Sequence, residues 1–421
     1  MFIETNELKG ILIYINKQNF MADHDWKRLC ELIPCVFIVD TPERKVELKS
    51  KVADGTKFIL NHSPLFGLPQ TIQEAVDLLG IELFELAYIT NDMTFLPQLH
   101  SEPIGSILLS QGRRLPYHYH GFTPDFILCS LDELIDVITQ KYKGYLAEVY
   151  LTKDGSYHHG YQGYVFQTSL KDSTLPYSVT ICGRYFDPSH YKFNSHQLSH
   201  RIKRSKLDGT QNALFSEVLI PVIDSFNADG ITRVPPRPSK VSADRLKTLI
   251  QENILRSRPT LNDYLDALIC TREYREQKQL GSDARFANVK DAFYSSNLVS
   301  GKHIILLDDV FTTGATVTEC AETLRKAGAT KVSILAIASH QFTPKSFVFS
   351  RSTLSCPVDR CDGHLRLTLK RNNDFFYGCS NFSKNNCKGG TNYFEGWHSI
   401  NKQNMIGNYY SDFDDFDDLD F

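Results

Sequence analysis

The sequence predicts an α/β protein of several domains, and three observations lead to that prediction. The chain has 421 residues, more than one ordinary hydrophobic core accommodates, so two or three domains are expected. Short apolar runs alternate with amphipathic helical patterns in two separate stretches, which is typical of doubly wound sheets. Four of the ten cysteines gather near the end of the sequence, which predicts a metal site.

Composition narrows the classes of function. The net charge is -3, so the chain has no global basic field for nucleic acid, and any such binding must be local. The sequence has no apolar run of membrane length, and its start, MFIETNELKG, lacks the polarity of a secretion signal. We therefore expect a cytoplasmic protein without a membrane partner. In that reducing compartment ten cysteines do not indicate a disulfide framework.

Residues 1–140 read as the first α/β domain, in which buried strands alternate with helical patterns such as 71–79 and 131–139. The expected strands are 10–15, 35–39, 57–60, 87–90, 104–109 and 125–129. The segments AYITND (87–92) and FTPDFILCSLDEL (122–134) resemble haloacid-dehalogenase-like (HAD-like) domains.

That family places an aspartate nucleophile just after the first strand, where this chain has Asn16. Asparagine cannot form a phospho-aspartyl intermediate. The resemblance therefore implies a non-catalytic domain used for binding or assembly. A flavodoxin-like domain is the alternative.

Residues 141–195 change character, because apolar and aromatic residues alternate with polar ones at 145–151, 164–170 and 177–183. This pattern predicts an antiparallel, β-rich segment of about three strands between the α/β domains. A basic turn follows at 201–206. It could bind phosphate or nucleic acid, or it could be a solvated helix end.

The most informative stretch is GKHIILLDDVFTTGAT, residues 301–316. A buried strand is expected up to Leu307, then the acids Asp308 and Asp309, a turn of small residues and a helix over 317–327. A further strand is expected at 331–339. Ligands of parallel sheets bind at the carboxyl ends of strands, where free N–H groups of a helix N-terminus attract phosphate. The acids can hold sugar hydroxyls or Mg²⁺, which prefers oxygen ligands.

LLDDVFTTGAT resembles the signature of type I phosphoribosyltransferases, which bind phosphoribosyl pyrophosphate (PRPP). The resemblance implies that 196–350 forms a phosphoribosyltransferase domain and that Asp308 and Asp309 hold the ribose hydroxyls. The implied 5′-phosphate loop consists of Thr312, Thr313, Gly314, Ala315 and Thr316.

Residues 277–280 and 285–293 resemble the run found in ComF-type members, a group associated with DNA uptake. In type I phosphoribosyltransferases a loop after an early strand holds pyrophosphate, which makes Arg237 and Lys240 candidates here, and the ComF-type run adds Arg285. Arg272 and Asn288 would lie near the mouth of the PRPP site, or they could be structural braces. Thr312 stands where purine-salvage members have an acid, and threonine cannot do acid–base work near neutral pH, which argues against that reaction.

Residues 351–400 contain two cysteine pairs around a hairpin expected at 364–370 and 374–377. Such pairs predict a tetrahedral zinc site. The predicted ligands are Cys356, Cys361, Cys379 and Cys387. The phrases CPVDRC, GHLRLTLKR and FFYGCSNF resemble the zinc ribbons of type IA topoisomerases, although both cysteine pairs are spaced more widely here.

Those ribbons bind single-stranded DNA, which implies the same partner for this one. Cations can meet phosphates while aromatic rings stack on bases. The candidate residues are Arg366, Lys370, Arg371, Phe375 and Phe376. A purely structural ribbon is the alternative.

Residues 401–421 end in DFDDFDDLDF, a block too acidic to pack on itself. The spaced aromatics predict docking onto a protein partner or onto the chain's own basic surface. A solubilising tail is the third interpretation.

Two functions remain open. One is Mg²⁺-dependent transfer of phosphoribose from PRPP to an unknown acceptor, with release of pyrophosphate. The other is a non-catalytic accessory in DNA uptake or processing, with single-stranded DNA on the zinc ribbon and PRPP as a regulator.

Overall fold

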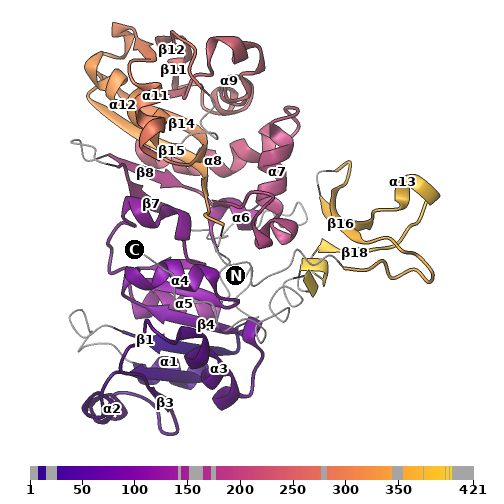
Figure 1. Cartoon of the computed structure of the whole chain (residues 1–421). Coiled ribbons are helices and arrows are strands. Elements are labelled where there is room, and N and C mark those ends of the chain that lie inside the picture. Colours follow the sequence, from indigo (N-terminus) through magenta and orange to yellow (C-terminus); the bar gives the residue numbers. More distant parts are fainter. Residues whose placement is uncertain are drawn as a thin grey trace.

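Two parallel sheets and one small antiparallel sheet organise the chain (Figure 1). The computed structural model describes residues 8–15, 26–140, 144–150, 165–171, 177–275, 282–343, 354–372, 374–393, 395–397 and 399–400. The first α/β domain occupies the lower part of Figure 1 and the second the upper part, while the C-terminal ribbon projects to one side. The predicted α/β class with parallel sheets is confirmed.

The first sheet has six parallel strands in the order β3-β2-β1-β4-β5-β6. The strands are β1 Gly10–Tyr14, β2 Cys35–Val39, β3 Lys57–Leu60, β4 Leu86–Thr90, β5 Gly105–Leu109 and β6 Phe126–Leu128. They agree with the strands expected from the sequence to within two residues at each end. A flavodoxin-like sheet has the order 2-1-3-4-5, so this alternative is wrong.

Helices cover both faces of this sheet, and every residue of β2, β4 and β5 is therefore buried. The helices are α1 Trp26–Leu32, α2 Pro42–Lys49, α3 Leu68–Leu79, α4 Leu96–Ser101 and α5 Leu131–Gln140, with short 3₁₀ turns at Leu83–Glu85, Met93–Phe95 and Tyr117–Phe122. Neighbouring residues of one strand enter opposite cores. Ile11 and Ile13 join one cluster and Leu12 the other. Asn16 lies outside the described residues.

The second sheet runs β11-β10-β14-β15-β8-β7, with the short β9 also paired to β15. Its strands are β7 Phe166–Ser169, β8 Ser178–Ile181, β9 Arg184–Tyr185, β10 Gly230–Arg233, β11 Asn262–Asp263, β14 His303–Phe311 and β15 Lys331–His340. All pairings are parallel except the hairpin of β7 and β8. The predicted helix and strand after the acid pair are both present.

The expectation of a separate three-stranded middle segment is wrong. The first predicted strand is instead helix α6, Leu146–Tyr150. The other two form the β7–β8 hairpin, which adds to the second sheet because β8 pairs with β15. Sequence pattern identifies a half-buried strand, but it does not identify the strand beside which it lies.

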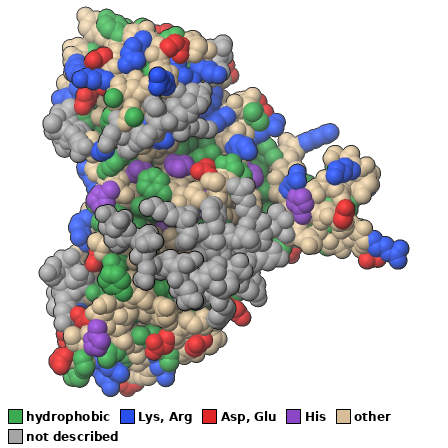
Figure 2. Space-filling view, in the orientation of Figure 1, with side chains coloured by type: hydrophobic (Ala, Val, Ile, Leu, Met, Phe, Trp, Pro, Cys, Tyr) green, Lys and Arg blue, Asp and Glu red, His purple; other side chains and the backbone are tan. Residues whose placement is uncertain are grey.

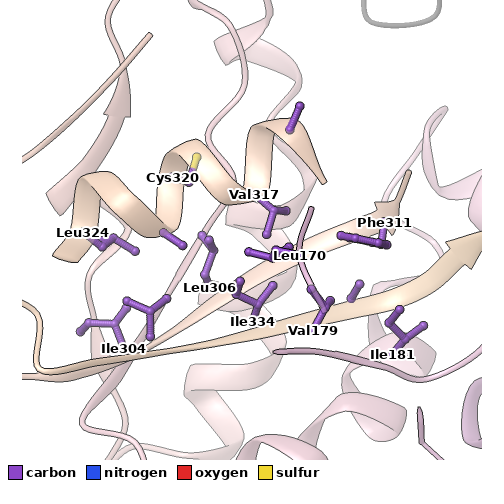
Figure 3. Packing of buried hydrophobic residues seen from close by; sticks show 14 of the residues in the cluster. Leu170, Val179, Ile181, Ile304, Leu306, Phe311, Val317, Cys320, Leu324 and Ile334 are labelled. Carbon is purple, nitrogen blue, oxygen red and sulfur yellow. The ribbon is translucent and has the colours of Figure 1, made fainter. Parts of the chain in front are cut away.

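Helix α12, Ala315–Lys326, covers one face of the second sheet (Figure 3). Its residues Val317, Cys320 and Leu324 pack over Ile304 and Leu306 of β14. The opposite face is covered by α7 Gln197–Ser205 and α8 Asn212–Phe226.

The remaining elements of this domain lie around the outer strands. They are η6 Tyr191–Ser195, η7 Pro238–Ala243, α9 Arg245–Leu249, a π-helix at Ile250–Ile254, α10 Leu255–Ser257, η9 Leu265–Ala267, β12 Leu268–Cys270, α11 Ser282–Val289, β13 Phe293–Ser295 and η11 Asn297–Val299. Strands β12 and β13 pair with each other in antiparallel fashion.

A buried ionic cluster joins the two α/β domains. Arg184 of β9 forms two bonds of 2.9 Å to the carboxylate of Glu148 on α6 and a third of 2.9 Å to Asp125 before β6. Histidines gather in the same region, with His100 Nε2 3.3 Å from His190 Nε2. Figure 2 shows histidine side chains at the surface of the region between the two α/β domains.

The C-terminal ribbon is a three-stranded antiparallel sheet of β16 Leu365–Leu369, β17 Phe375–Cys379 and β18 Gly390–Asn392, with the short helix α13 Phe382–Asn385. The predicted hairpin is present, and β18 was not predicted. One face rests on the second α/β domain: Tyr377 Oη donates to Asn194 O (3.2 Å) and Tyr393 Oη to Ser195 O (2.9 Å). Within the described part of the chain, no helix is long and apolar enough to cross a membrane.

Candidate functional site

The two predicted acids lie inside strand β14, not beyond its end. The strand continues through Asp308 and Asp309 to Phe311, and Asp308 pairs with Ala336 of β15. Both side chains are half-buried and lie near the carboxyl edge of the sheet. Each carboxylate accepts the next residue's N–H, with Asp309 N 2.9 Å from Asp308 Oδ1 and Val310 N 2.8 Å from Asp309 Oδ1. These contacts orient the pair.

The small-residue turn joins β14 to α12, as the sequence predicts. Gly314 caps the helix with φ 70° and ψ 0°, a left-handed conformation that favours glycine. A Cβ at this position would lie 2.8 Å from the Phe311 ring, so no larger residue fits without a shift. The first turn of α12 leaves N–H groups without intrahelical acceptors, and with the positive end of the helix dipole they suit an anion.

The first α/β domain contacts this turn directly. Tyr117 Oη donates to the carbonyl of Thr313 at 2.8 Å. The His120 ring packs edge-on against Phe311, with centroids 5.1 Å apart, and burial lowers the pKa of His120 to about 4. His120 is therefore neutral at pH 7, and its ring contributes to the packing around Phe311. The turn is thus held by residues nearly 200 positions away in sequence.

An arginine that sequence reasoning missed reaches the acid pair. Arg245, the first residue of α9, forms an ion pair with Asp309 and donates to Ser205 Oγ at 2.9 Å. Burial raises the pKa of Asp308 to about 7, against the opposing charges of Arg245 and Lys206. The pair therefore carries less negative charge than two free carboxylates. The only sequence feature that could have indicated Arg245 is the preceding Asp244, which caps the N-terminus of α9 and accepts a hydrogen bond from Lys247 N at 3.0 Å.

The residues predicted to bind pyrophosphate differ in their exposure and in their contacts. Arg237 is half-buried and donates to Tyr274 O at 2.8 Å, and the charges of Arg237 and Asp308 both influence the pKa of Tyr274. Lys240 is exposed on η7, and Arg285 lies half-buried on α11.

The side chains of the further candidates Arg272 and Asn288 form hydrogen bonds with nearby backbone groups. Asn288 bonds both backbone groups of Arg275, at 3.1 and 2.9 Å, and Arg272 donates to Asn288 O at 3.2 Å. These bonds hold the backbone beside α11, which favours the structural interpretation of both residues. The 277–280 motif lies outside the described residues.

The four predicted zinc ligands come together at the base of the ribbon. The Sγ atoms of Cys356, Cys361, Cys379 and Cys387 all lie within 4.8 Å of one another. Cys356 Sγ is 3.6 Å from Cys387 Sγ, and Cys361 Sγ is 3.7 Å from Cys379 Sγ. Tetrahedral zinc with bonds of about 2.3 Å places its sulfurs about 3.8 Å apart. The cluster therefore fits a metal such as zinc.

The surrounding backbone lies close to the four sulfur atoms and directs N–H groups at two of them. Gly363 N and Asn381 N point at Cys361 and Cys379 Sγ at 3.4 and 3.3 Å. A Cβ on Gly389 would come within 2.3 Å of Cys356 Sγ, so the chain approaches the sulfurs too closely for a side chain.

The proposed nucleic-acid residues fall on different faces of the ribbon. Phe375 is 7% exposed and stacks beneath Arg201 of α7, 4.8 Å from guanidinium carbon to ring centroid. In this arrangement the Phe375 ring is covered, so its predicted stacking on a base would require the ribbon to move away from α7. The others remain available: Arg366, Lys370 and Arg371 are exposed, and the half-buried Phe376 lies 5.7 Å from Lys370 Nζ.

No protein-family model matches the sequence. Among curated proteins, the chain resembles the DNA utilization protein YhgH of Escherichia coli K12 and of E. coli O157:H7, each 39% identical over 69 residues, or 16% of this chain and 30% of that protein. The YhgH protein of Salmonella typhimurium is 41% identical over 58 residues, 14% of this chain and 26% of that protein. The match thus spans about a third or less of these relatives.

Solved structures align only weakly. An orotate phosphoribosyltransferase of Mycobacterium tuberculosis aligns at 14% identity over 33% of this chain and 66% of that one, with a TM-score of 0.22. A phosphoribosyltransferase from Corynebacterium diphtheriae aligns at 16% identity over 33% and 82%, with a TM-score of 0.21. The GsuK channel aligns at 10% identity over 78% and 65%, with a TM-score of 0.20. Alignments at these scores are too weak to assign a function.

Proposed function

We propose that this protein binds PRPP at the carboxyl edge of its second sheet and transfers the phosphoribosyl group to an acceptor with release of pyrophosphate. One observation carries the proposal. Two oriented carboxylates on β14 are followed directly by a glycine-capped turn that opens helix α12, so acceptors for hydroxyls and donors for a phosphate converge at one edge.

Each part of the site has a distinct task in this proposal. Asp308 and Asp309 accept the ribose hydroxyls, and the turn Thr312–Thr316 with the first N–H groups of α12 holds the 5′-phosphate. Arg237 faces the pyrophosphate end, where a cation stabilises the charge that develops as that group leaves. A Mg²⁺ ion would supply further charge neutralisation, held by the two carboxylates. Fixed positions of donor and acceptor supply most of the catalysis.

The ion pair between Arg245 and Asp309 affects how the ribose hydroxyls bind. Because Asp309 already has an ion-pair partner, ribose hydroxyls must share its carboxylate with the guanidinium or displace it. The reduced charge of the acid pair also makes phosphate contacts at the turn more important for affinity.

The test replaces both acids by asparagine. Asp308→Asn with Asp309→Asn should weaken PRPP binding, measured by calorimetry with Mg²⁺, by about 100-fold or more, since each charge-assisted bond contributes about 1.5–3 kcal/mol. The matched control removes the same charge from two exposed acids of this domain, Glu252→Gln with Asp266→Asn. Pyrophosphate release with a panel of bases and nucleotides then tests catalysis. Equal PRPP binding by the acid-pair variant and the control would rule the site out.

A second candidate function, single-stranded DNA binding by the ribbon, is favoured by a separate observation. Arg366, Lys370 and Phe376 share the face of the ribbon that points away from the α/β domain. The partial similarity to proteins named for DNA utilization supports the same interpretation. The two functions are compatible, because they use different surfaces.

Phe376→Ala with Arg371→Ala should weaken binding of an oligothymidylate about 10-fold or more, because one stacked base contributes about 1–3 kcal/mol. Fluorescence anisotropy at fixed salt measures this. The control, Phe382→Ala with Lys384→Ala, removes an exposed ring and an exposed cation from α13. If both double variants bind like the unmodified chain, the ribbon is a structural module.

We further propose that the first α/β domain has a binding or assembly role. Asn16 is not a nucleophile, and the Tyr117 bond gives this domain a direct contact with the proposed phosphate turn.

A further inference from the structure

The outer face of the ribbon is an exposed surface that combines cations with an aromatic ring. Cross-strand pairing places Thr368 opposite Phe376, and Phe376 opposite Asn392. Arg366 pairs with Gly378 at the next position of the same face. Two exposed cations, Lys370 and Arg371, follow β16 directly. Figure 2 shows Lys and Arg side chains projecting from the ribbon.

Two glycines allow the ring of Phe376 to lie close to the sheet. Gly378 and Gly390 pair with each other on neighbouring strands, and neither fills the space next to Phe376. A Cβ on Gly378 would lie 2.9 Å from the Phe376 ring, so the ring lies directly over Gly378. The ring therefore occupies the space above Gly378, and a side chain from outside can contact the part of this half-buried ring that remains exposed.

Among the described residues, this is the face of the sheet that the second α/β domain does not cover. The opposite face carries Phe375 and Tyr377, which are buried against Arg201 and Asn194 of the second α/β domain.

The chain itself contains a segment of complementary chemistry. Residues 412–421, DFDDFDDLDF, hold six aspartates, three phenylalanines and one leucine. Acidic residues interleaved with apolar ones suit a surface on which cations border an aromatic ring, because the acids meet the cations while an apolar side chain contacts the exposed part of the Phe376 ring. This charge complementarity identifies the occupant.

We propose that segment 412–421 docks intramolecularly on the outer face of the ribbon, over Arg366, Lys370, Arg371 and Phe376. This inference goes beyond the PRPP and DNA functions and does not depend on either. If the ribbon also binds single-stranded DNA, the acidic segment competes for the same cations and limits access to that surface.

The chain length permits this docking. Ile400 is buried in the ribbon's own apolar cluster, so the chain leaves from the ribbon itself. The 11 residues 401–411 can span up to ~36–40 Å when extended, and a five-residue strand covers only ~17 Å. A tether of this kind raises the local concentration of the segment to the millimolar range.

The experiment uses a fluorescent peptide of residues 401–421 and the chain truncated after Ile400. The peptide should bind the truncated chain, with affinity falling several-fold between about 0.05 and 0.2 M salt, because exposed charges are screened. The intact chain should bind it at least ~10-fold more weakly, since its own segment already occupies the face. This difference should not depend on protein concentration.

Two matched changes locate the surface. Arg366→Glu with Lys370→Glu in the truncated chain should abolish peptide binding, whereas Lys384→Glu with Lys388→Glu, at exposed positions elsewhere on the ribbon, should reduce it far less. A peptide with all six aspartates changed to asparagine gives the same test without altering the protein, and should not bind.

The proposal is overturned if the truncated chain does not bind the peptide at millimolar concentration, or if intact and truncated chains bind it equally. It is also overturned if both charge-reversed variants lose binding to the same extent, since the contact would then be unspecific attraction.

Discussion

Replacing Arg184 by methionine is expected to lower the free energy of unfolding by about 3–5 kcal/mol, because it leaves two buried carboxylates without their cation. Arg184 is 5% exposed and holds Glu148 through both oxygens and Asp125 through one. Methionine preserves much of the side-chain volume, so the loss comes from the unpaired charges and not from a cavity. Urea or guanidinium unfolding followed by circular dichroism measures it.

The same cluster predicts acid sensitivity. Burial alone would raise the pKa of Glu148, but the Arg184 guanidinium outweighs it and holds that pKa well below its usual range. A carboxyl group with a depressed folded-state pKa stabilises the protein above its unfolded pKa, near 4.3–4.5, and the contribution is lost as pH falls below that. Arg184→Met should therefore unfold with a weaker dependence on pH between about 5 and 2.

Arg204→Met provides the control for this prediction. Arg204 pairs with Asp208 at 2.8 Å, but its side chain is 50% exposed, and exposed pairs contribute about 0–1 kcal/mol. If Arg184→Met costs no more than Arg204→Met, the buried cluster does not hold the domains together.

Removing the metal should unfold the ribbon. The ribbon's apolar cluster is small, and four thiols that converge without a cation lose the interaction that gathers them. Structural zinc contributes an apparent ~10–16 kcal/mol to folding of zinc-finger peptides, so chelation or Cys379→Ser should abolish the fold of 354–400 while the α/β domains remain folded. Tyr377 and Tyr393 would then lose their bonds to the second domain.

Metal analysis and limited proteolysis check this expectation. Protein purified under reducing conditions should contain about one equivalent of zinc, and chelation should open cleavage sites within the ribbon alone. Cys129→Ser is the matched control, since Cys129 is an exposed thiol of the first domain outside the cluster. Less than half an equivalent of metal, or identical cleavage before and after chelation, would contradict the assignment.

Local patterns were enough to predict most strands and the grouping of the four cysteines. Cys35–Val39 is an apolar run followed by Asp40, and such a run locates a buried strand closely. The four cysteines could be grouped because ribbon ligands come from two short segments near each other in sequence.

Contacts distant in sequence could not be predicted. Arg245 pairs with Asp309 across 64 positions, and the Tyr117–Thr313 bond spans 196. Phe375 and Phe376 look alike in sequence, but strand alternation buries one and leaves the other on the outer face. Which face is covered depends on the docking of the ribbon against α7, and no local pattern records that docking.

The place of the β7–β8 hairpin also has a consequence during protein synthesis. β8 ends at Ile181, but its parallel partner β15 begins only at Lys331, roughly 150 residues later. At ~5–20 residues per second this is an interval of about 8–30 s, in which the first sheet can close while the hairpin emerges with an unpaired edge. A nascent chain stalled between these points exposes that edge to other strands, so chaperone dependence should peak in this window and fall once residue 340 leaves the ribosome.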